Sequence, residues 1–166
     1  MPSEVRLPVT SQKIRVLVVD DSAVIRQRIT DCVAGTNDME ISATASNGRA
    51  AIEAFEATKP DVVTLDVHMP DMDGLATLDA ILERRPVAVI MVSSMTQLGA
   101  SVTLDALERG AMDYVAKPER GGEAEAVLGD ELLRKIRSFA RADVQRILQI
   151  RQDRKDRLAH RQAHRH

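Results

Sequence analysis

Short apolar runs recur along the chain, separated by longer segments in which apolar residues lie three or four positions apart. The runs are rich in β-branched residues, too short for helices, and too continuously apolar for strands with one solvent-exposed face. They predict five buried parallel strands, at Ile14–Val19, Ile41–Ala45, Val62–Leu65, Val87–Val92 and Tyr114–Ala116.

The segments between these runs carry the signals of five helices. Ser22 and Asn47 are suitable N-terminal caps for the first two helices, and Pro60 cannot continue the second. A glycine at the end of a helical pattern, as at Gly35 and Gly110, favours termination. The predicted helices are 22–35, 47–59, 74–83, 98–109 and one that begins after Gly122.

Alternating strands and helices predict an α/β fold. Right-handed crossovers place a helix between successive parallel strands, so helices should cover both faces of a parallel sheet. Five strands fit the doubly wound, flavodoxin-like order 2-1-3-4-5, in which strands 1 and 3 are neighbours. Ligands of such sheets bind at the carboxyl ends of the strands, where the winding reverses. We therefore expect functional side chains where strands 1 and 3 end.

Charge divides the 166 residues into an acidic body and a basic tail. Residues 1–133 contain 12 Lys and Arg against 22 Asp and Glu, whereas residues 134–166 contain 11 against 3. Nucleic-acid binding by the tail is disfavoured, because it has no recognition motif and no aromatic interleaving. An amphipathic helix is expected to continue to about residue 150. We predict a flexible arm at 1–12, a domain at 13–138, and a basic helical extension or interdomain linker at 139–166.

Composition excludes several classes of protein. The single cysteine, Cys32, cannot form a disulfide within the chain, and a reducing compartment is expected. One cysteine and four scattered histidines cannot build a zinc or iron–sulfur centre. No apolar run approaches the roughly 20 residues that span a membrane, and the amino-terminal region lacks the apolar centre of a signal peptide. We expect a soluble, cytoplasmic protein with no membrane partner.

Polar residues of complementary chemistry lie where the predicted strands end. Asp20 and Asp21 follow the first strand, Asp66 the third, Ser93 the fourth and Lys117 the fifth. Neighbouring carboxylates raise one another's pKa unless a cation neutralises them. Oxygen ligands of this kind favour Mg²⁺, which is typically bound by one or two carboxylates together with a phosphate. The pattern therefore predicts a magnesium site with a phosphoryl substrate.

Asp66 is the best-placed nucleophile, because it ends the central strand with the other polar residues around it. The Lys117 ammonium and the Ser93 hydroxyl would share the charge of the phosphoryl oxygens while the carboxylate attacks in line. The product would be an aspartyl phosphate, which adds about two negative charges at a loop edge. Such a charge change is the chemistry of a switch.

Four ordered motifs resemble the receiver domain of two-component response regulators. The resemblance covers residues 14 to about 137, and it implies phosphorylation of Asp66 by a histidine kinase. The motifs are Val18-Val19-Asp20-Asp21-Ser22, Leu65-Asp66 followed by Met69-Pro70-Asp71-Met72-Asp73-Gly74, Val92-Ser93-Ser94, and Tyr114-Val115-Ala116-Lys117-Pro118.

The resemblance implies a metal site for Mg²⁺. Its ligands would be the carboxylates of Asp20, Asp21 and Asp66, directly or through water, and the backbone carbonyl of His68. The imidazole ring of His68 is expected to have no part in binding the metal.

The resemblance also implies a catalytic set and a switch. Asp66, Lys117 and Ser93 would carry out the phosphotransfer, which the chain catalyses on its own aspartate. Ser93 would follow the phosphoryl group, Lys117 would pair with it, and Tyr114 would change rotamer with the state. In this family the bond between Lys117 and Pro118 is usually cis.

A narrower resemblance is to the receiver of the chemotaxis protein-glutamate methylesterase. It rests on residues 61–66, on 91–96 and on 110–114. Members of that family continue into an esterase domain with a nucleophilic serine, but no serine follows residue 138 here. We therefore expect either a receiver separated from its effector domain or a stand-alone, single-domain response regulator that acts by binding other proteins.

Partners and alternatives follow from this resemblance. The histidine kinase is the expected phosphodonor, and an effector domain or downstream protein would bind the face formed by 98–109, 114–116 and the fifth helix, with a dimer as a further possibility. The competing hypothesis is a phosphohydrolase with an aspartate nucleophile. Enzymes resembling the haloacid dehalogenases place an acidic residue two positions after the nucleophile, where this chain has His68.

Overall fold

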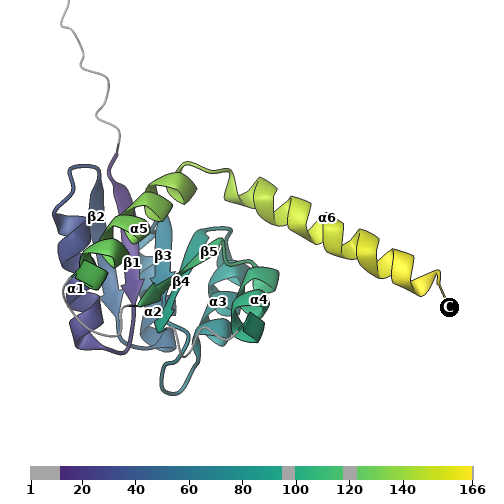
Figure 1. Cartoon of the computed structure of the whole chain (residues 1–166), viewed down its shortest axis with the longest axis horizontal. Helices are drawn as coiled ribbons and strands as arrows, with labels where there is room; N and C mark the ends of the chain where they lie inside the picture. The colour runs from purple at the N-terminus through teal and green to yellow at the C-terminus, as the bar shows by residue number, and fades with distance from the viewer. Residues whose placement is uncertain (1–11, 95–99, 118–122, 166) are drawn as a thin grey trace, which may run out of the picture.

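A computed structural model gives the fold and describes residues 12–94, 100–117 and 123–165. Strands and helices alternate along the chain, and a long helix follows the last strand–helix unit (Figure 1). The elements are β1 (Ile14–Val19), α1 (Ala23–Ala34), β2 (Met39–Ala45), α2 (Gly48–Thr58), β3 (Val62–Leu65), α3 (Gly74–Arg84), β4 (Ala88–Ser94), α4 (Ala100–Arg109), β5 (Asp113–Lys117), α5 (Glu123–Ala140) and α6 (Val144–Ala163).

The five strands form one parallel sheet in the order β2-β1-β3-β4-β5, which confirms the predicted α/β fold and strand order. β3 lies at the centre and pairs with β1 on one side and with β4 on the other. All four of its residues are buried, as expected for a central strand covered on both faces. The carboxyl ends of the strands therefore meet at one edge.

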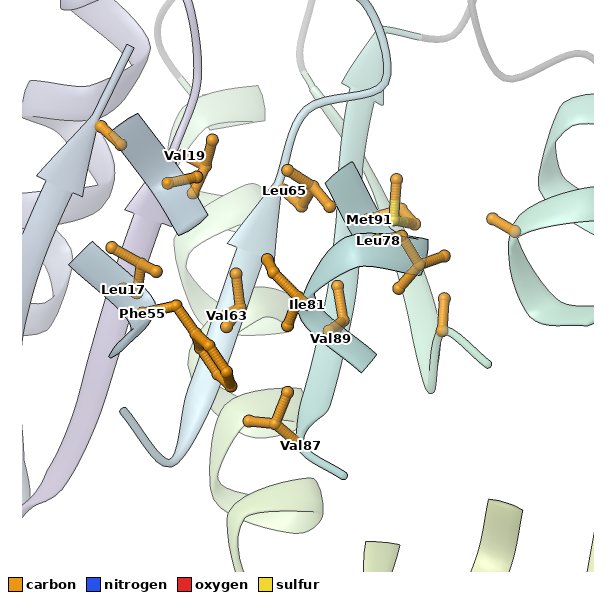
Figure 2. Close-up of a cluster of buried hydrophobic side chains, with 14 of the residues drawn as sticks. Leu17, Val19, Phe55, Val63, Leu65, Leu78, Ile81, Val87, Val89 and Met91 are labelled. Atoms are coloured by element: carbon orange, nitrogen blue, oxygen red, sulfur yellow. The ribbon is translucent and has the colours of Figure 1, made fainter. Parts of the chain in front are cut away.

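Helices cover both faces of the sheet, and the sheet itself separates two aliphatic cores. On one face, Leu17, Val63 and Val89 of the strands contact Phe55 of α2 and the apolar side of α3 (Figure 2). On the other face, alternate strand residues contact α1 and α5. Because successive side chains of a strand point to opposite faces, each strand supplies both cores. The second core contains Val16, Val18, Ile29, Val33, Val62, Ile90, Val92, Leu132 and Ile136.

Side-chain caps fix where the helices begin. The Ser22 hydroxyl accepts a hydrogen bond from the Ile25 N–H at 3.3 Å, and the Asn47 side chain accepts one from the Ala50 N–H at 2.8 Å. Both caps agree with the sequence prediction. Asp73 caps α3 in the same way, through the Ala76 N–H at 2.8 Å.

Strand boundaries differ from the prediction where pairing extends them. β2 begins at Met39, two residues early, because Met39 pairs with Ile14 of β1. β4 ends at Ser94 rather than at the predicted Val92. Ser93 and Ser94 pair with the last residues of β5, so these serines belong to the strand instead of the loop after it.

The prediction of one extended helix to about residue 150 is wrong. α5 ends at Ala140, and a new helix, α6, begins at Val144 and continues to Ala163. The reason is local, because the Asp143 carboxylate accepts a hydrogen bond from the Arg146 N–H at 3.1 Å and so caps a second helix. The described helices include none that is long and apolar enough to cross a membrane.

α6 leaves the sheet domain and extends past α4 (Figure 1). Its residues are half-buried or exposed. Two cations attach it to the end of α4: Arg151 donates to the Ala111 carbonyl at 2.8 Å, and Lys155 donates to the Glu108 carbonyl. The structure therefore places a basic helix against a helix C-terminus, where the backbone dipole favours positive charge.

Candidate functional site

The carboxyl edge of the sheet brings together four predicted site residues, Asp20, Asp21, Asp66 and Lys117. Val19 and Leu65 are register partners in β1 and β3, so the residues that follow them, Asp20 and Asp66, lie side by side. The Asp66 N–H donates to the Val19 carbonyl at 3.0 Å, which extends the strand pairing to the site. Lys117 is the last residue of β5.

An ion-pair network joins these residues. The Lys117 Nζ lies 2.6 Å from Asp20 Oδ2 and 3.3 Å from Asp66 Oδ1. Both aspartates are almost completely buried, with 1% and 2% of their surface exposed. Two buried carboxylates thus share one ammonium group, which can compensate only one of their two negative charges.

The third carboxylate lies at the solvent side of the same cluster. Oxygen atoms of Asp20, Asp21 and Asp66 lie within 4.8 Å of one another, and Asp21 is exposed whereas the other two are buried. Burial, followed by the negative charge of Asp20, raises the pKa of Asp66 to about 7, although Lys117 acts in the opposite direction. The cluster therefore holds more negative charge than its single lysine compensates.

The donor set fits a small divalent cation. Three carboxylates offer the hard oxygen ligands that Mg²⁺ prefers. Within the part of the chain that the structure describes, Asp20 Oδ2 and Asp66 Oδ1 accept no hydrogen bond, and their contact is the Lys117 ammonium. Two buried carboxylates that share one ammonium group, beside an exposed third carboxylate, favour the binding of a cation from solvent.

Comparison with known families decides what kind of domain this is. The model of the response regulator receiver domain matches residues 16–129. The chain belongs to the response regulator receiver family.

Curated relatives connect this receiver with one type of response regulator. A protein-glutamate methylesterase/protein-glutamine glutaminase of Pyrococcus abyssi is 44% identical over 146 residues, which cover 87% of this chain and 39% of that protein. The enzyme of the same name from Salmonella typhimurium is 47% identical over 133 residues, 80% of this chain and 38% of that protein. The chain thus spans less than two-fifths of the length of these relatives.

Solved structures agree with this assignment. The response regulator domain of Thermotoga maritima CheB superimposes with a TM-score of 0.74 at 41% identity, covering 80% of this chain and 99% of that chain. The chain in a CheX-CheY-BeF₃-Mg²⁺ complex of Borrelia burgdorferi gives a TM-score of 0.67 at 29% identity, with 78% and 90% covered. The receiver therefore matches a CheB receiver along almost the whole length of that domain.

Hydrogen bonds around Asp20 orient the receiver's acidic cluster. The Ser22 N–H donates to Asp20 Oδ1 at 2.9 Å, and Arg26 Nη1 donates to the Asp20 carbonyl at 2.7 Å. Sequence reasoning missed this role of Arg26. Its position in the first turn of α1, directly after the Asp-Asp-Ser segment, is the signal that could have indicated it.

A glycine permits the turn after β3. The Gly74 N–H donates to the Val67 carbonyl at 2.7 Å, which draws the start of α3 against the end of β3. A Cβ atom at Gly74 would lie 2.1 Å from the Asp66 carbonyl oxygen. Gly74 was part of the sequence motif, but only the structure shows that it allows close contact with Asp66.

The remaining predicted residues occupy different surroundings. Ser93 is fully buried near the end of β4 and pairs in register with Ala116, the neighbour of Lys117. Tyr114 is 41% exposed, and Lys135 Nζ lies 5.5 Å from the centre of its ring. His68 is exposed. The predicted cis bond between Lys117 and Pro118 lies outside the described residues, because Pro118 is not among them.

Proposed function

We propose that this receiver is a phosphorylation switch in which Asp66 accepts a phosphoryl group from a histidine kinase with the help of Mg²⁺. The single observation that carries the proposal is the convergence of Asp20, Asp21 and Asp66 with Lys117 at one edge of the sheet. A nucleophile, a cation site and a fixed ammonium group are the components that phosphoryl transfer to a carboxylate needs.

The proposed reaction forms a bond between a carboxylate oxygen of Asp66 and phosphorus. The phosphorus–nitrogen bond to the kinase histidine breaks at the same time, and its electron pair returns to the imidazole. Asp66 must be ionised to attack, and its pKa of about 7 means that a nearby cation increases the reactive fraction at neutral pH. When bound, Mg²⁺ would supply positive charge to the phosphoryl oxygens.

Lys117 and Ser93 would act on the phosphoryl group itself. Lys117 already contacts both buried aspartates, so its ammonium can move to a phosphoryl oxygen with little displacement. The Ser93 hydroxyl, buried near the end of β4, would donate a hydrogen bond to another oxygen. The Borrelia burgdorferi relative in complex with BeF₃ and Mg²⁺ supports a site of this type in the fold.

For the metal, we propose Asp20, Asp21, Asp66 and the His68 carbonyl as ligands. For the switch, we propose Ser93 and Tyr114. The exposed ring of Tyr114 on β5 would turn inward when Ser93 moves toward the phosphoryl group. Lys135, whose ammonium lies 5.5 Å from the centre of the Tyr114 ring, would favour the outward arrangement through a cation–π contact.

We propose that the output is control of a protein-glutamate methylesterase in a chemotaxis pathway. The support is the identity of 43–53% with enzymes of that name, of which this chain covers less than two-fifths. The effector would bind the face made by α4, β5 and α5. Leu104 on α4 and Tyr114 on β5 are large exposed side chains on these elements.

The proposal is tested by phosphorylation with acetyl phosphate and Mg²⁺, followed by intact-mass spectrometry. The wild-type chain should gain one phosphoryl group, and Asp66→Asn should gain none. Asp153→Asn, a change to a carboxylate on exposed α6, is the matched control and should be phosphorylated normally. Modification that persists in Asp66→Asn, or release of free phosphate without a phosphorylated chain, would contradict the proposal.

A further inference from the structure

A buried hydroxyl on β3, in the strand that leads to Asp66, has no role in the function proposed above. Thr64 precedes Asp66 by two residues on β3 and is 1% exposed. Figure 2 shows Val63 and Leu65 of β3 in the core beside α2 and α3. Thr64 lies between them in sequence, so its side chain points to the opposite face, the face of Asp66.

Thr64 is a polar residue in apolar surroundings. Its register partners are Val18 of β1 and Ile90 of β4, which both belong to the aliphatic core beside α1 and α5. The strand itself is otherwise Val62, Val63 and Leu65. Valine has nearly the same shape as threonine, so packing alone would favour valine at this position.

The Thr64 hydroxyl makes no hydrogen bond to any described residue of the chain. Among the described residues, three buried side-chain atoms lack a hydrogen-bond partner: Thr64 Oγ1, Asp20 Oδ2 and Asp66 Oδ1. All three residues lie on β1, β3 or directly after them, the two strands that are neighbours at the switch point of the sheet. Buried polar atoms in folded proteins are bonded to protein or to ordered water in the great majority of cases.

The three atoms match the hydrogen-bonding capacity of one water molecule. A hydroxyl can donate one hydrogen bond, and each carboxylate oxygen can accept one. A water molecule accepts from the hydroxyl and donates its two hydrogens to the two oxygens, which gives it three partners, the typical number for a buried water. The carboxylate oxygens keep lone pairs for Lys117, because each has two.

We propose that Thr64 is a positioning residue of the receiver, and that its hydroxyl binds a buried water which bridges to Asp20 and Asp66. The water would bind both carboxylates on the side of Thr64, while Lys117 at the end of β5 contacts them as well. Fixing the Asp66 carboxylate in this way favours in-line attack on phosphorus. The kinetic part of this inference rests on the proposed function, whereas the water site itself does not.

The decisive experiment is a pair of crystal structures at high resolution, of the wild-type chain and of Thr64→Val, with Thr64→Ser as the matched control. We expect an ordered water within hydrogen-bonding distance of Oγ and of the Asp20 and Asp66 carboxylates in the wild type and in Thr64→Ser. The water should be lost in Thr64→Val. A wild-type structure in which the hydroxyl bonds to a protein group, with no water bridging the carboxylates, overturns the proposal.

Kinetics then tests the consequence. With acetyl phosphate and Mg²⁺, Thr64→Val should be phosphorylated roughly tenfold more slowly, comparable to the loss of an outer-shell partner of a metal ligand. Thr64→Ser should retain most of the wild-type rate, and thermal unfolding of metal-free Thr64→Val should show no loss of stability. An unchanged rate in Thr64→Val overturns the positioning role. If the wild type itself is not phosphorylated on Asp66, the proposed function fails, and the crystal structures still decide the water site.

Discussion

Lys117 stabilises the ionised carboxylate of Asp66, whereas burial and the neighbouring Asp20 destabilise it. Its carboxylate is buried next to Asp20, and these two effects raise its pKa to about 7 even with Lys117 at 3.3 Å. The ionised form is therefore less favourable in the folded chain than in the unfolded chain, where an aspartate has a pKa near 3.9. Asp66 thus lowers the stability of the fold at neutral pH.

The free energy of unfolding should consequently depend on pH through this one group. The folded state binds more protons than the unfolded state between about pH 4 and pH 7, so stability is greatest below pH 4 and falls as the pH rises through that window. Asp66→Asn removes the effect. In EDTA at pH 8 we expect Asp66→Asn to be more stable than the wild type by at most about 4 kcal/mol, since a shift from about 3.9 to about 7 is roughly three pKa units of about 1.4 kcal/mol each.

Urea denaturation at pH 4.5 and pH 8 measures this difference, and it should be small at the lower pH. Asp153→Asn on exposed α6 should not reproduce it. Addition of Mg²⁺ at pH 8 should stabilise the wild type more than Asp66→Asn, because a ligand stabilises the state that binds it. An Asp66→Asn variant that is no more stable than the wild type at pH 8 would show that Lys117 compensates both carboxylates.

The sequence could predict the acidic cluster because backbone topology alone brings it together. Asp20, Asp66 and Lys117 each end or follow a strand of one parallel sheet, so strand order suffices to make them neighbours. The contact of Arg26 with the Asp20 carbonyl and the outward position of Tyr114 depend on rotamers. Choices between rotamers are made by packing that a one-dimensional pattern does not contain.

At the scale of elements, boundaries were predictable where a side chain caps a helix and less so where pairing extends a strand. Ser22 and Asn47 begin α1 and α2 as predicted, because a cap acts within three residues. The ends of β2 and β4 depend on neighbouring strands that are distant in sequence. The break before α6 was missed although Asp143 is a local cap, because the apolar spacing continues across it.

The junction of β3 and α3 is the element contact on which the site depends most directly. A methyl group at Gly74 would lie 2.1 Å from the Asp66 carbonyl oxygen and 2.7 Å from the Val67 Cα. Both obstacles are backbone, so neither can move without moving the backbone that carries Asp66. We expect Gly74→Ala to lower the free energy of unfolding by about 2–3 kcal/mol or more, and to slow phosphorylation of the molecules that remain folded.

Gly35 offers a matched control at the end of another helix. Its φ of −75° is accessible to any residue, and a Cβ there would meet nothing closer than the Asp31 carbonyl oxygen at 3.5 Å. Gly35→Ala should change stability by less than about 1 kcal/mol, and a small increase is expected from the reduced freedom of the unfolded chain. Urea denaturation of the two variants checks the comparison. Equal effects at both positions would refute the role given to the β3–α3 junction.

At the scale of the whole molecule, the two parts of the chain carry opposite charge and meet at the end of α4. α6 contains six Lys and Arg residues against two Asp, whereas residues 1–133 are acidic. At the start of α6, Val144, Ile147 and Leu148 pack against the core beside α1 and α5, and beyond them Arg151 and Lys155 bind the Ala111 and Glu108 carbonyls. The part of α6 beyond Leu148 is largely exposed and derives its fixed position from these two polar contacts.

Removing the two cations should therefore release the part of α6 beyond Leu148 without unfolding the receiver. In the double variant Arg151→Ala and Lys155→Ala, we expect faster amide hydrogen exchange along that part of α6, because most helical stability in proteins comes from tertiary packing. The thermal midpoint of the sheet domain should change little, since the two aliphatic cores contain no residue of α6 that is fully buried. Arg157→Ala, on an exposed part of the same helix, is the control and should leave the exchange unchanged. Unchanged exchange in the double variant would mean that the apolar contacts of Val144, Ile147 and Leu148 hold the helix, and a large fall in the thermal midpoint would mean that α6 belongs to the folding unit of the receiver.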